Sequence, residues 1–312
     1  MSETSIARKS GRLATELSAS HPFGTLATAD QLVMADDPII SMTMASAEEN
    51  VLLVREALVG MSYALDLDAV ALEDILTAVT EACNNVVLHA YPRGAGPLLF
   101  EVSGENDVIE AVVRDHGVGV RPKLRSSRAQ IAGIGIPVIQ SLAQRVEFRR
   151  PSSDGGTEVR MEFEARPAGT LNGIASEVSS VPLPFQYDPA SVAITVAPSR
   201  LLRSMLPRLL GVLGAQADFS TSRLSDVHIL ADALAAHAPD ALEVDGLALI
   251  ASVTPRSLQL CVGPLSAAGS ERLLDAAAIP SLGSVIERLT DGHSMSPGDG
   301  PGMLALELRD RV

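Results

Sequence analysis

A carboxylate and an amide stand one helical turn apart in the first half of the chain. Glu81 and Asn85 lie four residues apart in a segment whose apolar residues recur every three or four positions, which predicts a helix with both side chains on its polar face. Such a pair could hold a metal-bound phosphate. The same spacing also arises by chance on a solvated helix face, and spacing alone does not separate the two interpretations. The apolar stripe of this helix comprises Leu72, Leu76, Val79, Cys83, Val86 and Ala90.

Two glycine-rich pieces follow along the chain. Asp115-x-Gly117-x-Gly119 comes directly after a strand-like run, and Gly133-x-Gly135 precedes a helix-like segment. Glycines let the backbone approach phosphate, and a helix N-terminus offers free N–H groups to an anion. Asp115 could accept a hydrogen bond from an exocyclic amine such as that of adenine. Each piece alone is also typical of an ordinary turn, where aspartate and glycine are common.

The elements that must position these residues follow a simple order. Strand, two helices, hairpin, basic loop, helix and hairpin together predict an α+β sandwich, with helices on one face of a mixed, mostly antiparallel sheet. Ser46 is the predicted start of the first helix, because Glu48 and Glu49 follow it. The predicted segments are a strand at 39–44, helices at 46–65 and 68–91, a hairpin of 98–102 and 108–114, a basic loop at 120–132, a helix at 138–145, and a hairpin of 146–150 and 157–163.

Composition limits the kind of protein. A chain of 312 residues is long enough for two domains, and 46% hydrophobic residues allow sizeable cores. The formal net charge of −14 opposes binding to nucleic acid and favours a basic protein partner. No apolar run reaches the roughly 18 residues of a membrane span, and no signal pattern opens the chain. Cys83 and Cys261 lie in separate apolar segments and predict no disulfide framework, as is typical of the cytoplasm.

The four pieces, in this order, resemble the N box and the three glycine boxes of the GHKL ATP-binding proteins, which include histidine kinases and gyrase-type ATPases. The most similar branch is that of the anti-sigma-factor serine/threonine kinases, whose N box typically reads Glu-Ala-x-x-Asn-x-x-x-His-Gly/Ala-Tyr. The resemblance covers roughly residues 38–166 and implies the GHKL, or Bergerat-type, fold. It is carried by Glu81-x-x-x-Asn85 with His89-Ala90-Tyr91 for the N box, and by Asp115-x-Gly117-x-Gly119, Gly133-x-Gly135 and Gly156-Thr157 for the three glycine boxes.

The resemblance assigns a role to each of these residues. Asn85 would hold the magnesium ion that bridges the phosphates of ATP. Glu81 would be the general base that takes the proton from a partner's serine or threonine hydroxyl. Asp115, assisted by Thr157, would recognise adenine. The residues that would shape the lid around the phosphates are Gly117, Gly119, Gly133 and Gly135, with Arg128 as a further candidate phosphate contact. Phosphoryl transfer needs mainly positioning, charge neutralisation and one such base, so these roles agree with the chemistry of the residues.

The resemblance implies an ATP-dependent serine/threonine protein kinase that binds an alternative sigma factor and phosphorylates an anti-anti-sigma partner with a STAS-like domain. An alternative keeps the fold without catalysis, as an ATP-binding module that switches a protein partner by nucleotide occupancy. A histidine kinase core is disfavoured, because residues 1–37, which we expect to be a mobile tail, are too short to supply a helical pair with a phosphoacceptor histidine.

The pattern of the first domain returns after a predicted linker at residues 167–190, which is rich in Pro, Gly and Ser. We therefore expect a second GHKL-like domain at residues 191–312, made by tandem repetition. The alternative is that two α+β domains merely share an order of elements. The matching segments are 192–199 with 39–46, 201–213 with the first helix, 225–239 with the helix of Glu81, a hairpin of 247–253 and 257–262, 285–289 with 138–142, and 299–308 with 154–163.

The chemistry is missing from this second copy. Its alignment replaces the candidate site residues by residues that bind neither magnesium nor adenine, so we expect one nucleotide site per chain. Because kinases of the resembled family commonly act as homodimers, the second copy could replace a second subunit as an intramolecular pseudo-dimer. In the alignment Glu81 becomes Ile229, Asn85 becomes Ala233, Asp115 becomes Gly263, and Gly133 and Gly135 become Pro280 and Leu282.

Overall fold

The computed structural model of the protein describes residues 38–105, 107–118, 135–150, 155–164, 181–183, 185–279, 283–295 and 302–311. All of the helices and strands considered below belong to one compact unit. The predicted tail, the predicted basic loop and most of the predicted linker lie outside the described residues. So do Gly119, Gly133 and Arg128 of the first domain, and Pro280 and Leu282 of the second.

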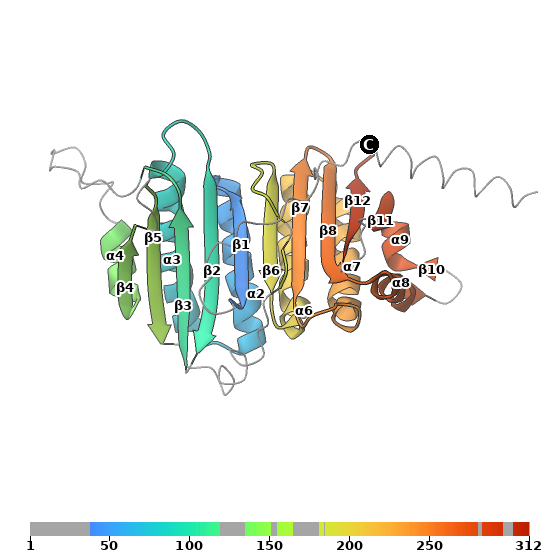
Figure 1. The fold of residues 1–312 in the computed structure, drawn as a ribbon, viewed down its shortest axis with the longest axis horizontal. Coiled ribbons are helices and arrows are strands. Elements are labelled where there is room, and N and C mark those ends of the chain that lie inside the picture. The colour runs from blue at the N-terminus through green and yellow to red at the C-terminus, as the bar shows by residue number, and fades with distance from the viewer. Residues whose placement is uncertain are drawn as a thin grey trace, which may run out of the picture. The chain divides into compact units, whose positions relative to one another are not determined.

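The first half follows the predicted order of elements, with β2 longer than expected and α4 beginning earlier. Two long helices follow the first strand, and a hairpin leads to the loop of Asp115 (Figure 1). The elements are β1 (Ile40–Ala45), α2 (Glu48–Leu65), α3 (Ala69–His89), β2 (Pro97–Glu105), β3 (Val108–Asp115), α4 (Gly135–Leu142), β4 (Arg145–Arg149) and β5 (Thr157–Glu164).

The second half opens with the same order of strand, two long helices and hairpin. Additional short elements then precede its last strand. The elements are β6 (Ser191–Val196), η1 (Ser199–Leu201), α6 (Leu202–Gln216), α7 (Thr221–His237), η2 (Ala238–Asp240), β7 (Leu247–Thr254), β8 (Ser257–Leu265), α8 (Ala267–Ala276), β9 (Ala278–Ile279), β10 (Gly283–Ser284), α9 (Val285–Leu289), β11 (Gly292–Met295) and β12 (Gly302–Arg309).

One ten-stranded sheet runs through the described part of both halves. Its order is β11-β12-β8-β7-β6-β1-β2-β3-β5-β4, so the two halves meet where β6 pairs with β1. Each half contributes five strands in corresponding order outward from this junction. Every described strand pairing is antiparallel. The sequence had predicted a mixed sheet that is mostly antiparallel. The common order agrees with a tandem repeat, which itself stays a prediction.

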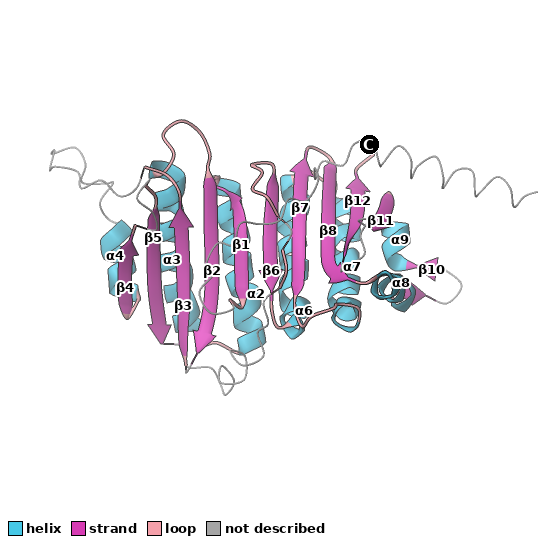
Figure 2. Cartoon of the chain, viewed as in Figure 1, coloured by secondary structure: helices cyan, strands magenta, loops and turns pink. Residues whose placement is uncertain are grey.

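The long helices cover one face of the sheet (Figure 2). Alternate strand residues point toward these helices and form the core, as the two-residue period of a strand requires. On β1, for example, Met42 and Met44 belong to the core, whereas Ser41 and Thr43 point to the opposite face. Leu98, Phe100 and Val102 continue the core on the next strand. The predicted α+β arrangement with helices on one face is therefore confirmed.

The two long helices of the first half begin differently. Asp68 caps α3 as predicted, because its carboxylate accepts a hydrogen bond from the Val70 N–H at 3.2 Å. Ser46 does not cap α2, which was the prediction. The helix begins at Glu48 after Ala47, without a side-chain cap. The Ser46 hydroxyl instead accepts a hydrogen bond from the Gly96 N–H at 3.1 Å, so it joins the end of β1 to the start of β2.

None of the described helices is long and apolar enough to cross a membrane.

Candidate functional site

Helix α3 separates a core face from a face that carries Glu81 and Asn85. The predicted stripe is buried from Leu76 to Ala90, and Leu72 lies half-buried against the core. Glu81 and Asn85 are both half-buried. Because the core face anchors the helix independently, their side chains are available for chemistry without being needed for packing.

Helix α4 begins directly against the Glu81 carboxylate. A Cβ atom added to Gly135 would lie 2.2 Å from Glu81 Oε1, which is closer than any real Cβ contact. A side chain at position 135 would therefore displace the Glu81 carboxylate from this place. The structure thus brings together Gly135 and Glu81, which the sequence had placed in separate boxes, and puts a carboxylate beside the N-terminal end of a helix, where negative charge is favoured.

Asp115 is a buried carboxylate at the end of β3. Its side chain is buried, with the residue only 3% exposed, and its Oδ1 accepts a hydrogen bond from the Gly117 N–H at 2.7 Å. Thr157 lies opposite Asp115 on β5 and also hydrogen-bonds to the carboxylate. Burial raises the pKa of Asp115, and the hydrogen bonds from Gly117 and Thr157 offset part of that shift. A carboxylate has about four acceptor positions, so this one can accept a further donor.

The loop after Asp115 is packed against backbone on two sides. A Cβ atom on Gly117 would lie 2.1 Å from the carbonyl oxygen of Ala90, the residue that caps the C-terminus of α3. The Gly156 N–H donates to the Gly117 carbonyl at 2.8 Å, with φ of +89° at Gly156 and +129° at Gly155. These two positions favour glycine because L side chains rarely adopt such φ values. The first and last glycine boxes therefore meet at the end of α3.

Tyr91 fixes this loop, a role that the sequence did not indicate. Its hydroxyl donates to the Pro97 carbonyl at 2.7 Å and accepts from the His116 N–H at 2.8 Å. Its ring also lies against Gly96, where an added Cβ would be only 2.2 Å away. Burial raises the pKa of Tyr91 to about 12, so the phenol stays protonated and can keep both bonds. The residue was visible in the His-Ala-Tyr motif, but its partners are distant in sequence.

The arrangement fits an adenine nucleotide with magnesium. Asp115 offers a buried acceptor for an amine, and the glycine contacts hold the surrounding loops close. No group of three or more His, Cys, Asp or Glu side chains converges as a metal site among the described residues. Magnesium commonly takes only one or two ligands from protein and the others from phosphate and water, so the Asn85 amide oxygen suits it.

Comparisons with known proteins identify the family of the first half. Residues 44–163 match the family model described as histidine kinase-like ATPase domain. The anti-sigma F factor of Oceanobacillus iheyensis is 30% identical over 141 residues, which cover 42% of this chain and 96% of that protein. The anti-sigma F factor of Pasteuria penetrans is 30% identical over 126 residues, covering 37% and 84%. The serine-protein kinase RsbW of Halalkalibacterium halodurans is 32% identical over 125 residues, covering 36% and 76%. The chain therefore belongs to the histidine kinase-like ATPase family.

Proposed function

We propose that the protein is an ATP-dependent serine/threonine kinase of the anti-sigma-factor type. It would bind an alternative sigma factor and phosphorylate an anti-anti-sigma partner with a STAS-like domain. The observation that carries the proposal is the buried Asp115 carboxylate, held by Gly117 and Thr157 at the end of a strand. The names of the matched relatives, anti-sigma F factor and serine-protein kinase, support the same type of activity.

Three residues of the first half would bind the nucleotide. Asp115, with Thr157, would accept the adenine amine, and Asn85 would hold the magnesium ion. When bound, magnesium neutralises phosphate charge and ATP supplies the phosphoryl group. Gly117 and Gly135 would let the backbone and α4 come close to the nucleotide, and Gly119 and Gly133 would complete the lid.

Glu81 would act on the protein substrate. A carboxylate within hydrogen-bond reach of a serine or threonine hydroxyl can take its proton as the oxygen attacks phosphorus. Glu81 is half-buried beside Gly135, in the same helix as Asn85 and one turn before it. This spacing would keep the base next to the magnesium ligand and would orient the incoming hydroxyl.

The protein partners would be recognised by a strongly acidic chain. A formal net charge of −14 favours basic surfaces on a sigma factor and opposes direct contact with nucleic acid.

Both cysteines are buried and free in the described structure, which fits a reducing compartment such as the cytoplasm. Burial also raises the pKa of Cys83 to about 12 and that of Cys261 to about 11, so neither is a reactive thiolate.

Phosphate transfer to a STAS-domain protein tests the proposal. With radiolabelled ATP, the wild type should phosphorylate the partner, and Glu81→Gln should do so roughly 10²–10⁴-fold more slowly because the base is lost. ATP affinity should be unchanged in the variant. Glu73→Gln, on an exposed position of the same helix, is the matched control. Equal transfer rates in Glu81→Gln and wild type would reject Glu81 as the base and favour the switch by nucleotide occupancy.

A further inference from the structure

The two halves meet across two antiparallel strands and two packed helices. β1 pairs with β6, with Met42 opposite Ile194 and Thr43 opposite Ala193. On the helix-covered face of the sheet, behind the strands in Figure 1, α2 packs against α6. The approach is close at Gly60, where an added Cβ atom would lie 2.9 Å from the Met205 side chain. This junction therefore has the packing of a protein interior.

Corresponding positions of the two halves can be identified from the backbone. Asp66 lies just after α2 and Asp218 just after α6, and both have a positive φ, of 50° and 54°. Each is followed two residues later by a helix cap, Asp68 for α3 and Ser220 for α7. Asp107 and Arg256 likewise both have positive φ, in the turns of the two hairpins. Non-glycine residues with positive φ are uncommon, so their pairing aligns the halves without reference to side chains.

This alignment puts corresponding residues opposite each other at the junction. Glu56 and Arg208 lie the same number of residues before Asp66 and Asp218, and they form an ion pair at 3.0 Å. Met42 and Ile194 also correspond. Met44, two residues after Met42, pairs with Leu98, the first core residue of β2. Val196, two residues after Ile194, pairs in the same way with Leu247, the first core residue of β7. A residue that contacts its own counterpart marks a twofold axis.

We propose that the Glu56–Arg208 pair makes the surface of β1 and α2 select the second half of the same chain over a second copy of the first half. If two copies of the first half met through this surface, Glu56 would face another Glu56. Two copies of the second half would likewise bring Arg208 against Arg208. Like charges facing each other disfavour the wrong pairing, whereas one of each charge favours pairing within the chain.

A second contact of the Arg208 side chain also distinguishes the two halves. The Arg208 guanidinium lies 4.9 Å from the centre of the Tyr63 ring, a cation–π contact. The counterpart of Tyr63, at the same distance before Asp218, is Ala215. A first half paired with itself would contain the ring without the cation, and a second half paired with itself would contain the cation without the ring. Both contacts exist only when unlike halves meet.

The occupant of this surface can be identified by cross-linking the full chain. Thr43→Cys with Ala193→Cys puts two thiols on directly opposed residues of β1 and β6. Mild oxidation should give a disulfide within one chain, seen by mass spectrometry and as a monomer on a non-reducing gel. Thr43→Cys alone is the control. A covalently linked dimer, or no link between the introduced cysteines, would overturn the proposal.

The selecting pair can be tested by charge exchange. Arg208→Glu should lower the midpoint of thermal unfolding by roughly 2–4 °C and speed amide hydrogen exchange in β1 severalfold, because two carboxylates would then face each other. Arg203→Glu, on an exposed position of α6, is the matched control. Glu56→Arg combined with Arg208→Glu should restore most of the loss in both measurements, because the ion pair returns while the contact of Arg208 with Tyr63 does not. Equal effects of Arg208→Glu and Arg203→Glu, or no restoration in the double variant, would contradict the selecting role.

Discussion

The positions of the candidate site residues are polar in the first half and apolar in the second. α3 has 21 residues and α7 has 17, and both end at a histidine followed by an alanine cap, His89-Ala90 and His237-Ala238. Their later turns can therefore be compared by counting back from these ends. At the positions of Glu81 and Asn85, α7 carries Ile229 and Ala233. Ile229 is 51% exposed and Ala233 packs against the core.

The end of the strand differs in the same way. Val113 and Val262 both face the helices, so Asp115 corresponds to Pro264, one residue beyond the Gly263 that the sequence alignment gave. The alignment of the first strand needs the same shift, because Val192 corresponds to Ile40 and not to Ile39. Proline offers neither a carboxylate nor an N–H group. The comparison shows that this arrangement of helices and strands does not depend on the residues that we assign to the nucleotide.

The largest expected effect comes from Asn85. Asn85→Ala removes the amide that we expect to hold magnesium and should abolish magnesium-dependent ATP binding measured by calorimetry. The unfolding midpoint should change little, because the second half has alanine at this position without loss of its fold. Asn84→Ala, half-buried on the same helix, is the control and should bind ATP normally. Unchanged ATP affinity in Asn85→Ala would reject the assignment.

An intermediate effect is expected at Asp115. Asp115→Asn removes the charged acceptor for adenine and should weaken ATP binding by about tenfold to a hundredfold, the value of one hydrogen bond to a charged group. Asp107→Asn, at the exposed turn of the same hairpin, should bind as wild type does. If Asp115→Asn bound ATP as tightly as Asp107→Asn, adenine recognition would have to lie elsewhere.

The pH dependence of Asp115 gives a second test of its burial. Its pKa is raised in the folded state, so folding favours the protonated acid. Its contribution to stability is therefore largest below the ordinary pKa of aspartate and is lost as pH rises through the raised value. Asp115→Asn does not titrate, so its stability relative to wild type should increase across that pH range. ATP binding by wild type should show the opposite trend, weakening as pH falls and the carboxylate becomes protonated.

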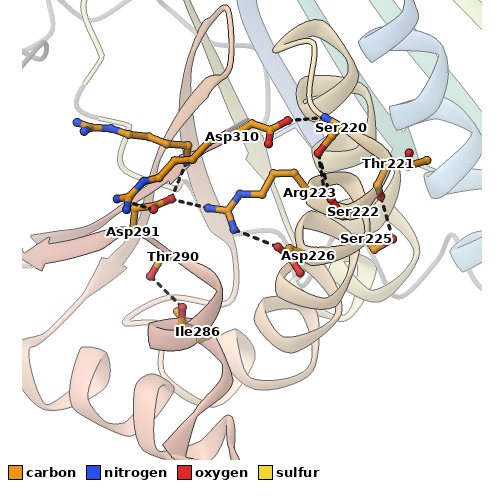
Figure 3. A network of polar contacts seen from close by, with 12 residues as sticks. Ser220, Thr221, Ser222, Arg223, Ser225, Asp226, Ile286, Thr290, Asp291 and Asp310 are labelled. Carbon is orange, nitrogen blue, oxygen red and sulfur yellow. Dashed lines mark hydrogen bonds and ion pairs between the residues drawn. The ribbon is translucent and has the colours of Figure 1, made fainter.

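The smallest effect concerns a polar network that ties the second half together (Figure 3). The Arg223 guanidinium binds Asp226 at 3.1 Å and Asp291 at 2.5 Å, and Asp310 accepts from the Ser220 N–H at 2.6 Å. Arg223→Ala should cost about 1 kcal/mol, or roughly 2–4 °C in the unfolding midpoint, because Asp291 keeps Arg311. ATP affinity should not change.

The exposed Arg272→Ala is the control for this network. An effect of Arg223→Ala on ATP affinity would show that the second half takes part in nucleotide binding, and would break the contrast between the halves. Equal stability of Arg223→Ala and Arg272→Ala would show that the network adds nothing measurable to the fold.

Local pattern was sufficient to predict much of the fold. The helix of Glu81 and Asn85 was predicted with its cap and its core face, because a 3.6-residue period and a capping aspartate act within a few residues. The position of Asp115 at the end of a strand was also predicted, since alternation stops there. The ends of α2 and β2 were less accurate, because Ser46 pairs with Gly96 across the sheet instead of capping the next helix.

Contacts between distant residues could not be predicted in this way. The bonds of the Tyr91 hydroxyl depend on where Pro97 and His116 lie after folding, and the contact of Gly135 with Glu81 depends on helix packing. Pairing of β1 with β6 left no local pattern at all, because either strand could have been an edge. The pseudo-dimer was a hypothesis taken from the resemblance, and the Glu56–Arg208 pair became visible only with the strand register.

We expect the chain to have one nucleotide site, built in the first half. Calorimetric titration of the full-length protein with a non-hydrolysable ATP analogue and magnesium tests it most directly. We expect a stoichiometry near one for the wild type and no binding for Asn85→Ala. Two sites per chain, or a site that survives in Asn85→Ala, would contradict the account.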